Sequence, residues 1–161
     1  LTNLGSPDAP TPVAVRRYLK EFLSDPRVVE MSRPLWWLIL NLVILNIRPR
    51  KSAALYKTIW TEAGSPLILN SQEQADKVRS ALENRYPGRI EVALGMRYGN
   101  PSIESALETL HNSGVKKLFV LPLYPQYSAT TTASTFDAVS GVLKAWRWLP
   151  ELHFVTHYHD D

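Results

Sequence analysis

The sequence contains no cysteine among its 161 residues. Its absence excludes disulfide bonds, thiolate metal sites, cysteine nucleophiles and cysteine-ligated iron–sulfur clusters within these residues. The net charge is also small, at +3. The basic residues are scattered along the chain, and no nucleic-acid-binding motif accompanies them. We therefore expect no nucleic-acid partner.

The sequence also lacks an apolar run long enough to cross a bilayer, which needs about 20 residues. Its longest apolar segment, Leu35–Ile47, is interrupted by Asn41 and Asn46. Three interpretations remain open: a buried helix, an apolar lip over a ligand cleft, or a segment lying in a membrane interface. Adjacent tryptophans and flanking cations are typical of a segment that lies in a membrane interface. These residues are Trp36, Trp37, Arg33, Arg48, Arg50 and Lys51.

Neither of the common phosphate-binding motifs, GxGxxG after the first strand and GxxxxGK[ST], is present. The Gly5-Ser6-Pro7 turn is a weak counterpart of such a loop. A nucleotide-binding α/β domain therefore stays an alternative with little support from the residues themselves.

What the sequence does contain is an alternation of helical and strand patterns. Thr11 is placed to cap a helix that begins at Pro12. Further helices are expected at 51–61, from a Ser71–Gln74 capping box to residue 86, from an Asn100 cap and Pro101 to Leu110, and at 135–146. Strands are expected at 1–4, 90–96, 117–123 and 152–158, with a polar loop over 124–132. Short connections between these elements predict an α/β domain with a three-layer, doubly wound parallel sheet, of flavodoxin or Rossmann type.

Ligands of such sheets bind beyond the carboxyl ends of the strands. Three of the expected strands lead directly into residues suited to binding, namely Asn3–Pro7, Met96–Pro101 and Leu123–Thr132. The tyrosines among them provide walls for a flat ligand, Arg97 provides a cation for a carboxylate, and the Ser/Thr row provides hydroxyl groups. We expect these three loops to form one site.

The motifs at these positions resemble those of ferrochelatases, in the same order and over essentially the whole chain. They are Asn3–Asp8, Phe22–Asp25, Gly64–Pro66, Met96–Pro101 and Leu123–Ser128. The resemblance implies the N-terminal α/β half, residues 1–161, of a two-domain, chelatase-like lyase of bacterial type. Such an enzyme inserts ferrous iron into protoporphyrin IX to give protohaem, the last step of haem biosynthesis. It is expected in the cytoplasm, either free or peripheral to the inner membrane.

Matching motif to motif implies a set of substrate-binding residues. Leu4 corresponds to a pocket residue near the porphyrin face, and Arg97 and Tyr98 correspond to the metal side of the cleft. The loop that borders the pocket is matched by Tyr124, Tyr127 and Ser128. Arg48 and Lys51 match basic residues that meet the porphyrin propionates. Residues 33–50 match an apolar lip, of which Trp36–Ile44 is the part that touches lipid in membrane-associated relatives.

Two family features are missing from these residues. The catalytic histidine motif, of the type Ser-Ala-His-Ser/Gly-Leu-Pro, and its acidic partner are absent. The resemblance places both beyond Asp161 in a C-terminal domain, so this chain is expected to be inactive alone. Ala129 stands where some relatives carry a cluster-ligating cysteine. No tightly bound cofactor is expected, and ferrous iron is a substrate. A non-catalytic tetrapyrrole-binding module remains an alternative.

A second group of polar residues lies near the end of the chain. His157 and His159 are two residues apart on an expected strand, with Asp160 and Asp161 following, a spacing that could bind a metal ion. Polar residues at the end of a strand have the same pattern. We therefore assign no metal ligand.

Overall fold

The computed structural model describes residues 1–160 and divides them into two compact units. Unit 1 comprises Leu1–Leu4, Asn70–Arg97 and the chain from Pro101 onward, and unit 2 comprises Gly5–Leu69 and Tyr98–Asn100. The two units have separate apolar cores. One core contains Ile103, Leu107, Leu118, Val120, Val139 and Leu143, and the other contains Leu23, Leu40 and Leu45.

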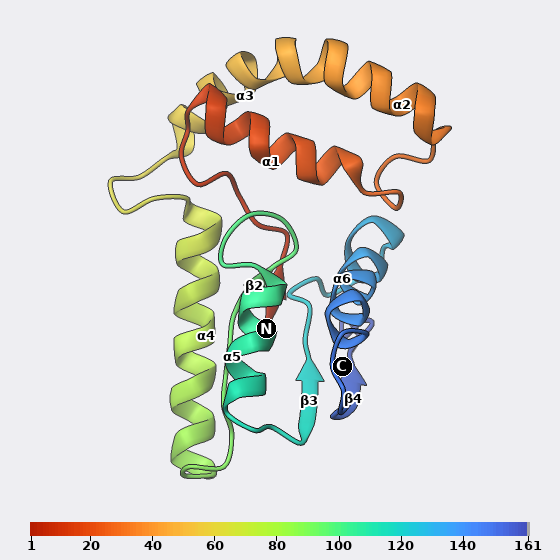
Figure 1. The fold of residues 1–161 in the computed structure, drawn as a ribbon. Coiled ribbons are helices and arrows are strands. Elements are labelled where there is room, and N and C mark those ends of the chain that lie inside the picture. The colour runs from red at the N-terminus through yellow and green to blue at the C-terminus, as the bar shows by residue number, and fades with distance from the viewer. Residues whose placement is uncertain (161) are drawn as a thin grey trace. The chain divides into compact units, whose positions relative to one another are not determined.

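Unit 1 is built on parallel strands. Strand β1 (Thr2–Asn3) pairs with β2 (Gly95–Met96), and β3 (Lys117–Val120) pairs with β4 (Glu151–Phe154), both in parallel. A parallel bridge between Thr2 and Pro122 joins the two pairs. The strand order is therefore β2–β1–β3–β4, which is the doubly wound arrangement predicted from the sequence (Figure 1).

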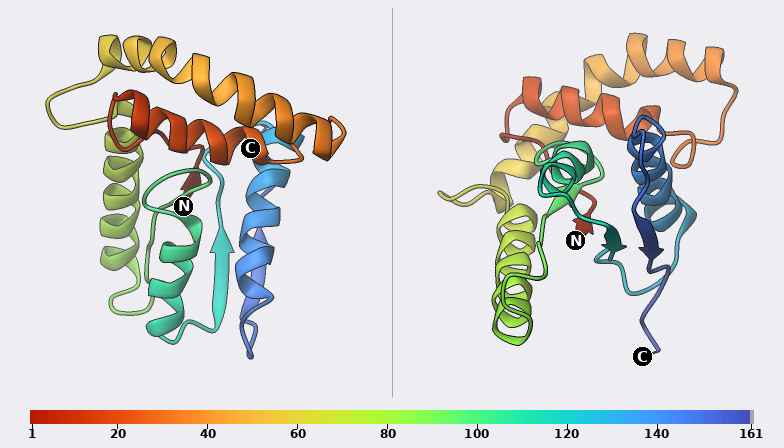
Figure 2. Two further views of the ribbon diagram at one scale, coloured as in Figure 1. Left: turned by 45° about the horizontal axis from the view of Figure 1, so that its top comes forward. Right: turned by 60° about the horizontal axis from the view of Figure 1, so that its bottom comes forward.

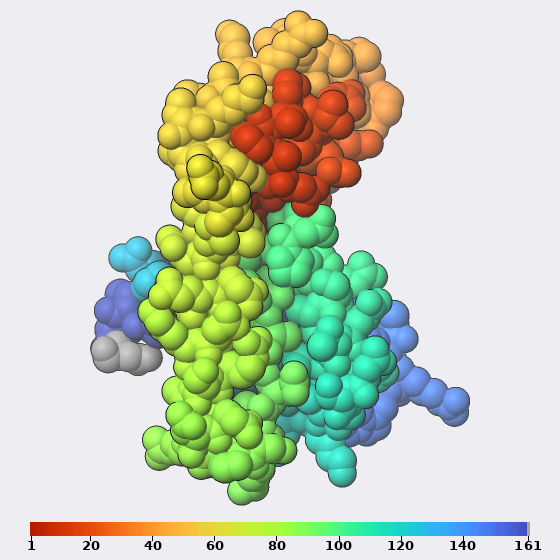
Figure 3. Space-filling view, turned by 90° about the vertical axis from the view of Figure 1, so that its left-hand side faces the viewer, coloured from red at the N-terminus to blue at the C-terminus, as the bar shows by residue number. Residues whose placement is uncertain are grey.

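Helices cover this sheet in two layers. Helices α5 (Ile103–Asn112) and α6 (Ser134–Leu143) pack together over β3 through the apolar core of unit 1. On the other face, residues 70–85 of helix α4 (Pro66–Arg85) pack beside β1 (Figure 2, right). Figure 3 looks onto the side of the molecule on which α4 lies. The connection from β1 to β2 runs one way across the sheet, and the connection from β2 to β3 runs the other way, past β1. Right-handed crossovers therefore place α4 and α5 on opposite faces.

Unit 2 is helical in its described part, apart from a bridge between Thr61 and Gly64. Helix α1 (Pro12–Ser24) begins as predicted, with Thr11 Oγ1 accepting a hydrogen bond from Ala14 N at 3.3 Å. It lies along a continuous helical segment made of α2 (Arg33–Ile39), a π-helix η1 (Leu40–Ile44) and α3 (Leu45–Ile59) (Figure 1).

Pro49 lies inside α3, where it has no N–H to donate to the carbonyl oxygen of Leu45. Arg16 of α1 supplies the missing donor, because its Nε lies 3.0 Å from Leu45 O. The hydrogen bond that proline removes from α3 is thus replaced by one that ties α3 to α1.

The apolar run Leu35–Ile47 therefore folds as helix, but most of it is not buried. Trp37, Leu42 and Ile47 are 61%, 66% and 55% exposed, whereas Leu40 and Leu45 are inside the core. The interpretation as a buried helix is wrong for the outward-facing residues. The segment is amphipathic, with one apolar stripe inside unit 2 and another at its surface.

Several expected boundaries are also wrong. The strands expected at 90–96 and 152–158 are shorter, namely β2 and β4, and the helix expected from residue 51 is α3, which begins at Leu45. The Ser71–Gln74 capping box does not start α4, which begins at Pro66, and Ser71 is buried in its interior. Ser102 rather than Asn100 caps α5, since Ser102 Oγ accepts from Ser105 N at 3.1 Å. The second half of the expected loop over 124–132 is a π-helix, η2 (Ala129–Ala133), that runs into α6.

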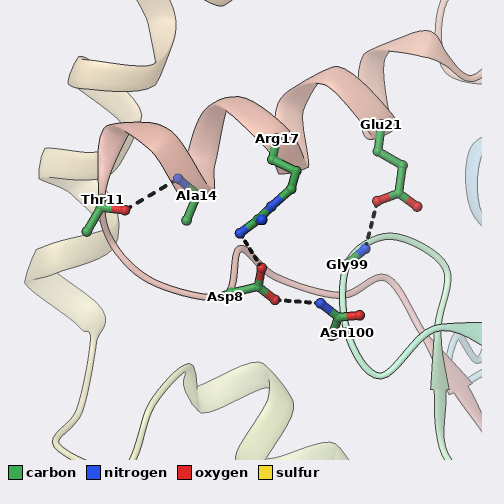
Figure 4. Close-up of polar contacts among 7 residues, drawn as sticks. All are labelled: Asp8, Thr11, Ala14, Arg17, Glu21, Gly99 and Asn100. Atoms are coloured by element: carbon green, nitrogen blue, oxygen red, sulfur yellow. Dashed lines mark hydrogen bonds and ion pairs between the residues drawn. The ribbon is translucent and has the colours of Figure 1, made fainter.

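The segment Tyr98–Asn100 belongs to unit 2 and is held there by polar contacts (Figure 4). Gly99 N donates to Glu21 Oε2 at 2.9 Å. Asp8 accepts from Asn100 Nδ2 at 2.9 Å and forms an ion pair with Arg17 at 2.8 Å. Helix α1 therefore fixes both this segment and the residues that follow β1.

Gly99 has two reasons to be glycine. Its φ of +76° lies in the left-handed region, and a Cβ there would lie 2.7 Å from the carbonyl oxygen of Ser6. We predict that Gly99→Ala lowers the free energy of unfolding by about 3 kcal/mol, roughly 1–2 from backbone strain and the rest from the clash. Gly88→Ala is the matched control, since φ is +65° and nothing lies within 4 Å. Urea denaturation checks both variants, and equal losses would show that the contact with Ser6 is unimportant.

Candidate functional site

The carboxyl ends of three strands meet at one edge of unit 1. Arg97 N donates to Asn3 O at 2.8 Å, which ties the end of β2 to β1. Leu123 N donates to Thr2 O at 2.7 Å, which ties the chain after β3 to the other side of β1. Leu4, Arg97 and Tyr124 therefore leave neighbouring strands at the same edge. This is the convergence predicted from the order of the strands.

Asn3 fixes the direction in which the chain leaves β1. Its Oδ1 accepts from Leu4 N at 2.8 Å, and its Nδ2 donates to Ser71 Oγ of α4 at 3.0 Å. Ser71 is 1% exposed. The backbone of Leu4, a half-buried residue, is thus held in place by Asn3 of β1 and, through Asn3, by helix α4.

Arg97 is half-buried and is held by the first residue of α6. Its Nε donates to Ser134 Oγ at 2.7 Å and to Ser134 O at 3.0 Å. These two hydrogen bonds orient the guanidinium group. A guanidinium group is suited to binding a ligand carboxylate or to stacking on a ring.

The loop after β3 supplies the aromatic and hydroxyl groups. Tyr124 is half-buried, with its hydroxyl oxygen inside the protein, and Tyr127 is 57% exposed. Ser128 caps η2, because its Oγ accepts from Thr130 N at 3.3 Å. Tyr158 N donates to Pro125 O at 2.9 Å, so the segment after β4 supports this loop. Burial raises the pKa of the Tyr158 phenol above its ordinary value.

Tyr98 has different surroundings from its neighbour in sequence. Its ring is fully buried in unit 2, edge-on to Phe22 with centroids 5.1 Å apart and edge-on to Tyr18 at 6.4 Å. Its hydroxyl donates to Asp25 Oδ2 at 2.8 Å. Asp25 is itself 5% exposed and also accepts from Arg27 N at 2.7 Å. Arg97 thus contacts Ser134, whereas Tyr98 contacts Phe22, Tyr18 and Asp25. A ligand-binding role for Tyr98 stays a prediction.

Arg48 and Lys51 lie on α3 of unit 2, one helical turn apart and exposed. Their spacing of three residues places them on the same side of the helix. The structure brings these two residues together, and it brings Leu4, Arg97 and Tyr124 to one edge of unit 1.

The histidines near the end of the chain do not form a metal centre within the described residues. The rings of His157 and His159 lie 5.8 Å apart, and His159 Nδ1 is 3.9 Å from Asp160 Oδ1. No group of three or more potential ligands is found among residues 1–160. Asp161, the fourth member of the proposed cluster, lies outside the described residues.

Three residues position predicted residues in ways that the sequence did not indicate. Ser134 holds Arg97 and Asp25 holds Tyr98, across 37 and 73 positions of sequence, while Asn3 holds Leu4 N and is itself tied to Ser71, 68 positions away. Asn3 and Asp25 lie in motifs named above, but their roles follow from these contacts. Periodicity cannot predict contacts over such separations.

Comparisons with known proteins agree on one family. The family model described as Ferrochelatase matches residues 1–161. A ferrochelatase of Thioalkalivibrio sulfidiphilus is 61% identical over 161 residues, which is 100% of this chain and 44% of that protein. One from Marinobacter nauticus is 58% identical over 160 residues, covering 99% of this chain and 43% of that protein. The chain thus spans less than half the length of these relatives.

The hydrogen bond between Tyr98 and Asp25 can be tested by substituting each partner. Asp25→Ala leaves the buried Tyr98 hydroxyl without this acceptor, and we predict a loss of about 2–3 kcal/mol in the free energy of unfolding. Tyr98→Phe removes the donor and keeps the ring, and should cost about 1 kcal/mol. Chemical denaturation measures both. A Tyr98→Phe loss equal to or larger than that of Asp25→Ala would contradict this account.

Proposed function

Because the chain belongs to the ferrochelatase family, we propose that the whole protein inserts ferrous iron into protoporphyrin IX to give protohaem. In this proposal residues 1–161 supply part of the wall of the porphyrin cleft. The observation that carries the proposal is the convergence of Leu4, Arg97 and Tyr124 at one edge of unit 1, through the hydrogen bonds of Arg97 N and Leu123 N to β1.

The residues of this edge have complementary tasks. Leu4 offers apolar contact to a ring face, and the phenol rings of Tyr124 and Tyr127 extend that surface. Arg97 contributes a fixed cation on the side of the metal, and the Ser128 hydroxyl adds a polar contact. A cleft of this kind holds a porphyrin out of its planar shape, with the strain offset by contacts remote from the reacting nitrogens.

Proton removal is assigned to the rest of the protein. Metal insertion releases two protons from the pyrrole nitrogens, which requires a base of suitable pKa. The family's histidine motif is not found in this sequence. We place that histidine and its acidic partner in the C-terminal domain, so that residues 1–161 bind and orient the porphyrin but do not deprotonate it. The greater length of the relatives supports an enzyme over a binding module of this size.

Arg48 and Lys51 are the proposed contacts for the porphyrin propionates. Both are exposed on one side of α3, and α3 continues directly from the apolar segment of α2 and η1. Cations next to an apolar surface suit a ligand with a ring at one end and carboxylates at the other.

The exposed stripe of the lip is the proposed contact with a membrane surface. No helix described for residues 1–160 combines the length and the apolar character that crossing a bilayer requires. Trp37, Leu38 and Leu42 are exposed, whereas Trp36 is turned inward and donates from Nε1 to Leu23 O at 2.7 Å. These exposures support a cytoplasmic protein that binds the surface of the inner membrane through this stripe.

The role of Arg97 is tested in the whole protein. Arg97→Ala should lower kcat/KM for the insertion of ferrous iron into protoporphyrin by about 10- to 100-fold, because a fixed cation is lost from the site. Arg147→Ala, at an exposed position after α6, is the matched control and should have the activity of the wild type. Steady-state assays measure both, and an unchanged Arg97→Ala protein would remove Arg97 from the site.

The membrane contact is tested with lipid vesicles. Trp37→Ala should reduce the binding of the whole protein to vesicles that contain anionic lipids by about threefold or more, because a large apolar side chain is removed from the interface. Trp148→Ala is the control, since Trp148 is similarly exposed, at 55%, but lies in unit 1. Co-sedimentation gives the bound fraction. Equal binding by the two variants would show that the lip is not the contact surface.

A further inference from the structure

The contact between Arg97 and Ser134 joins the end of β2 to the start of α6. Arg97 follows β2, whereas Ser134 follows η2 and begins α6. Ser134 lies outside the substrate-binding set derived above, and its side chain is 0% exposed. A residue so buried is not placed to touch a bound porphyrin, yet both of its oxygens accept from Arg97 Nε.

The segment around Ser134 is rigid enough to orient a partner. Thr132 and Thr135 are 1% and 0% exposed, and Ser128 caps the π-helix that ends at Ala133. Arg97 is anchored at its other end too, because its backbone N–H donates to Asn3 O at 2.8 Å. Both the backbone and the Nε edge of this arginine are thus held by elements of the same unit.

We propose that Ser134 is a positioning residue for metal insertion and fixes the plane of the Arg97 guanidinium group in the porphyrin site. This rests on the proposed function of Arg97. A guanidinium group is planar, so two acceptors on its Nε edge set the direction of its remaining nitrogens. The two hydrogen bonds also restrict rotation of the group, which lowers the entropy cost of meeting an anionic or electron-rich ligand.

A double-mutant cycle in the whole protein separates this role from a merely structural one. Ser134→Ala removes one of the two acceptors and should lower kcat/KM by about three- to tenfold, because the backbone oxygen of residue 134 still orients Arg97 Nε. In an Arg97→Ala background the same change should have no further effect, because the group that Ser134 positions is gone. Additive losses in the double variant would overturn the proposal.

Thr135→Val is the matched control for the cycle. Thr135 is the next residue and is equally buried, and its Oγ1 has no hydrogen-bond partner within residues 1–160. The change should therefore leave both kcat/KM and the free energy of unfolding near the wild-type values. A loss of activity in Thr135→Val as large as in Ser134→Ala would assign the effect to packing of the helix and overturn the proposal.

A direct measurement on the unsubstituted protein keeps the proposal testable even if Ser134→Ala does not fold. The Nε–H resonance of Arg97, identified by its absence in Arg97→Lys, should be protected from exchange with water. Free exchange of this proton would contradict the contact. If Arg97→Ala leaves activity intact, the proposed site fails. If Arg97→Ala lowers activity while Ser134→Ala does not, the positioning role alone fails.

Discussion

The site depends on the parallel alignment of three strand ends. Two backbone hydrogen bonds, from Arg97 N to Asn3 O and from Leu123 N to Thr2 O, place β1 between the ends of β2 and β3. Parallel strands connected by helices must deliver their carboxyl ends to one edge, so residues far apart in sequence gather there without any contact between their side chains. The chemistry of the edge then follows from which residues come next along the chain.

Side chains from the surrounding helices make that edge rigid. Ser71 of α4 holds Asn3, and Ser134 at the start of α6 holds Arg97, while Ser128 caps the π-helix between the loop and α6. The hydroxyl groups of all three serines form hydrogen bonds within the protein. Of the three, Ser128 belongs to the Ser/Thr row after β3, and its hydroxyl group maintains the shape of that loop.

The sequence predicted the gathering of Leu4, Arg97 and Tyr124, because that gathering follows from strand order alone. It did not predict the partners Asn3, Ser134 and Asp25, whose hydrogen bonds depend on the detailed register of helix against strand. It also misplaced the start of α4, because Pro66 is itself suited to a first helical position, and Ser71, inside the helix, accepts a hydrogen bond from Asn3. Tyr98 shows the same limit: its motif indicates a cleft, but its ring and hydroxyl are satisfied inside unit 2 by Phe22 and Asp25.

The central proposal is that this edge of unit 1 borders the tetrapyrrole. A crystal structure of the whole protein with protoporphyrin bound tests it most directly. The account predicts that Leu4, Arg97 and Tyr124 all lie within about 4 Å of the macrocycle or its substituents. A macrocycle bound elsewhere, with none of these three side chains in contact, would contradict it.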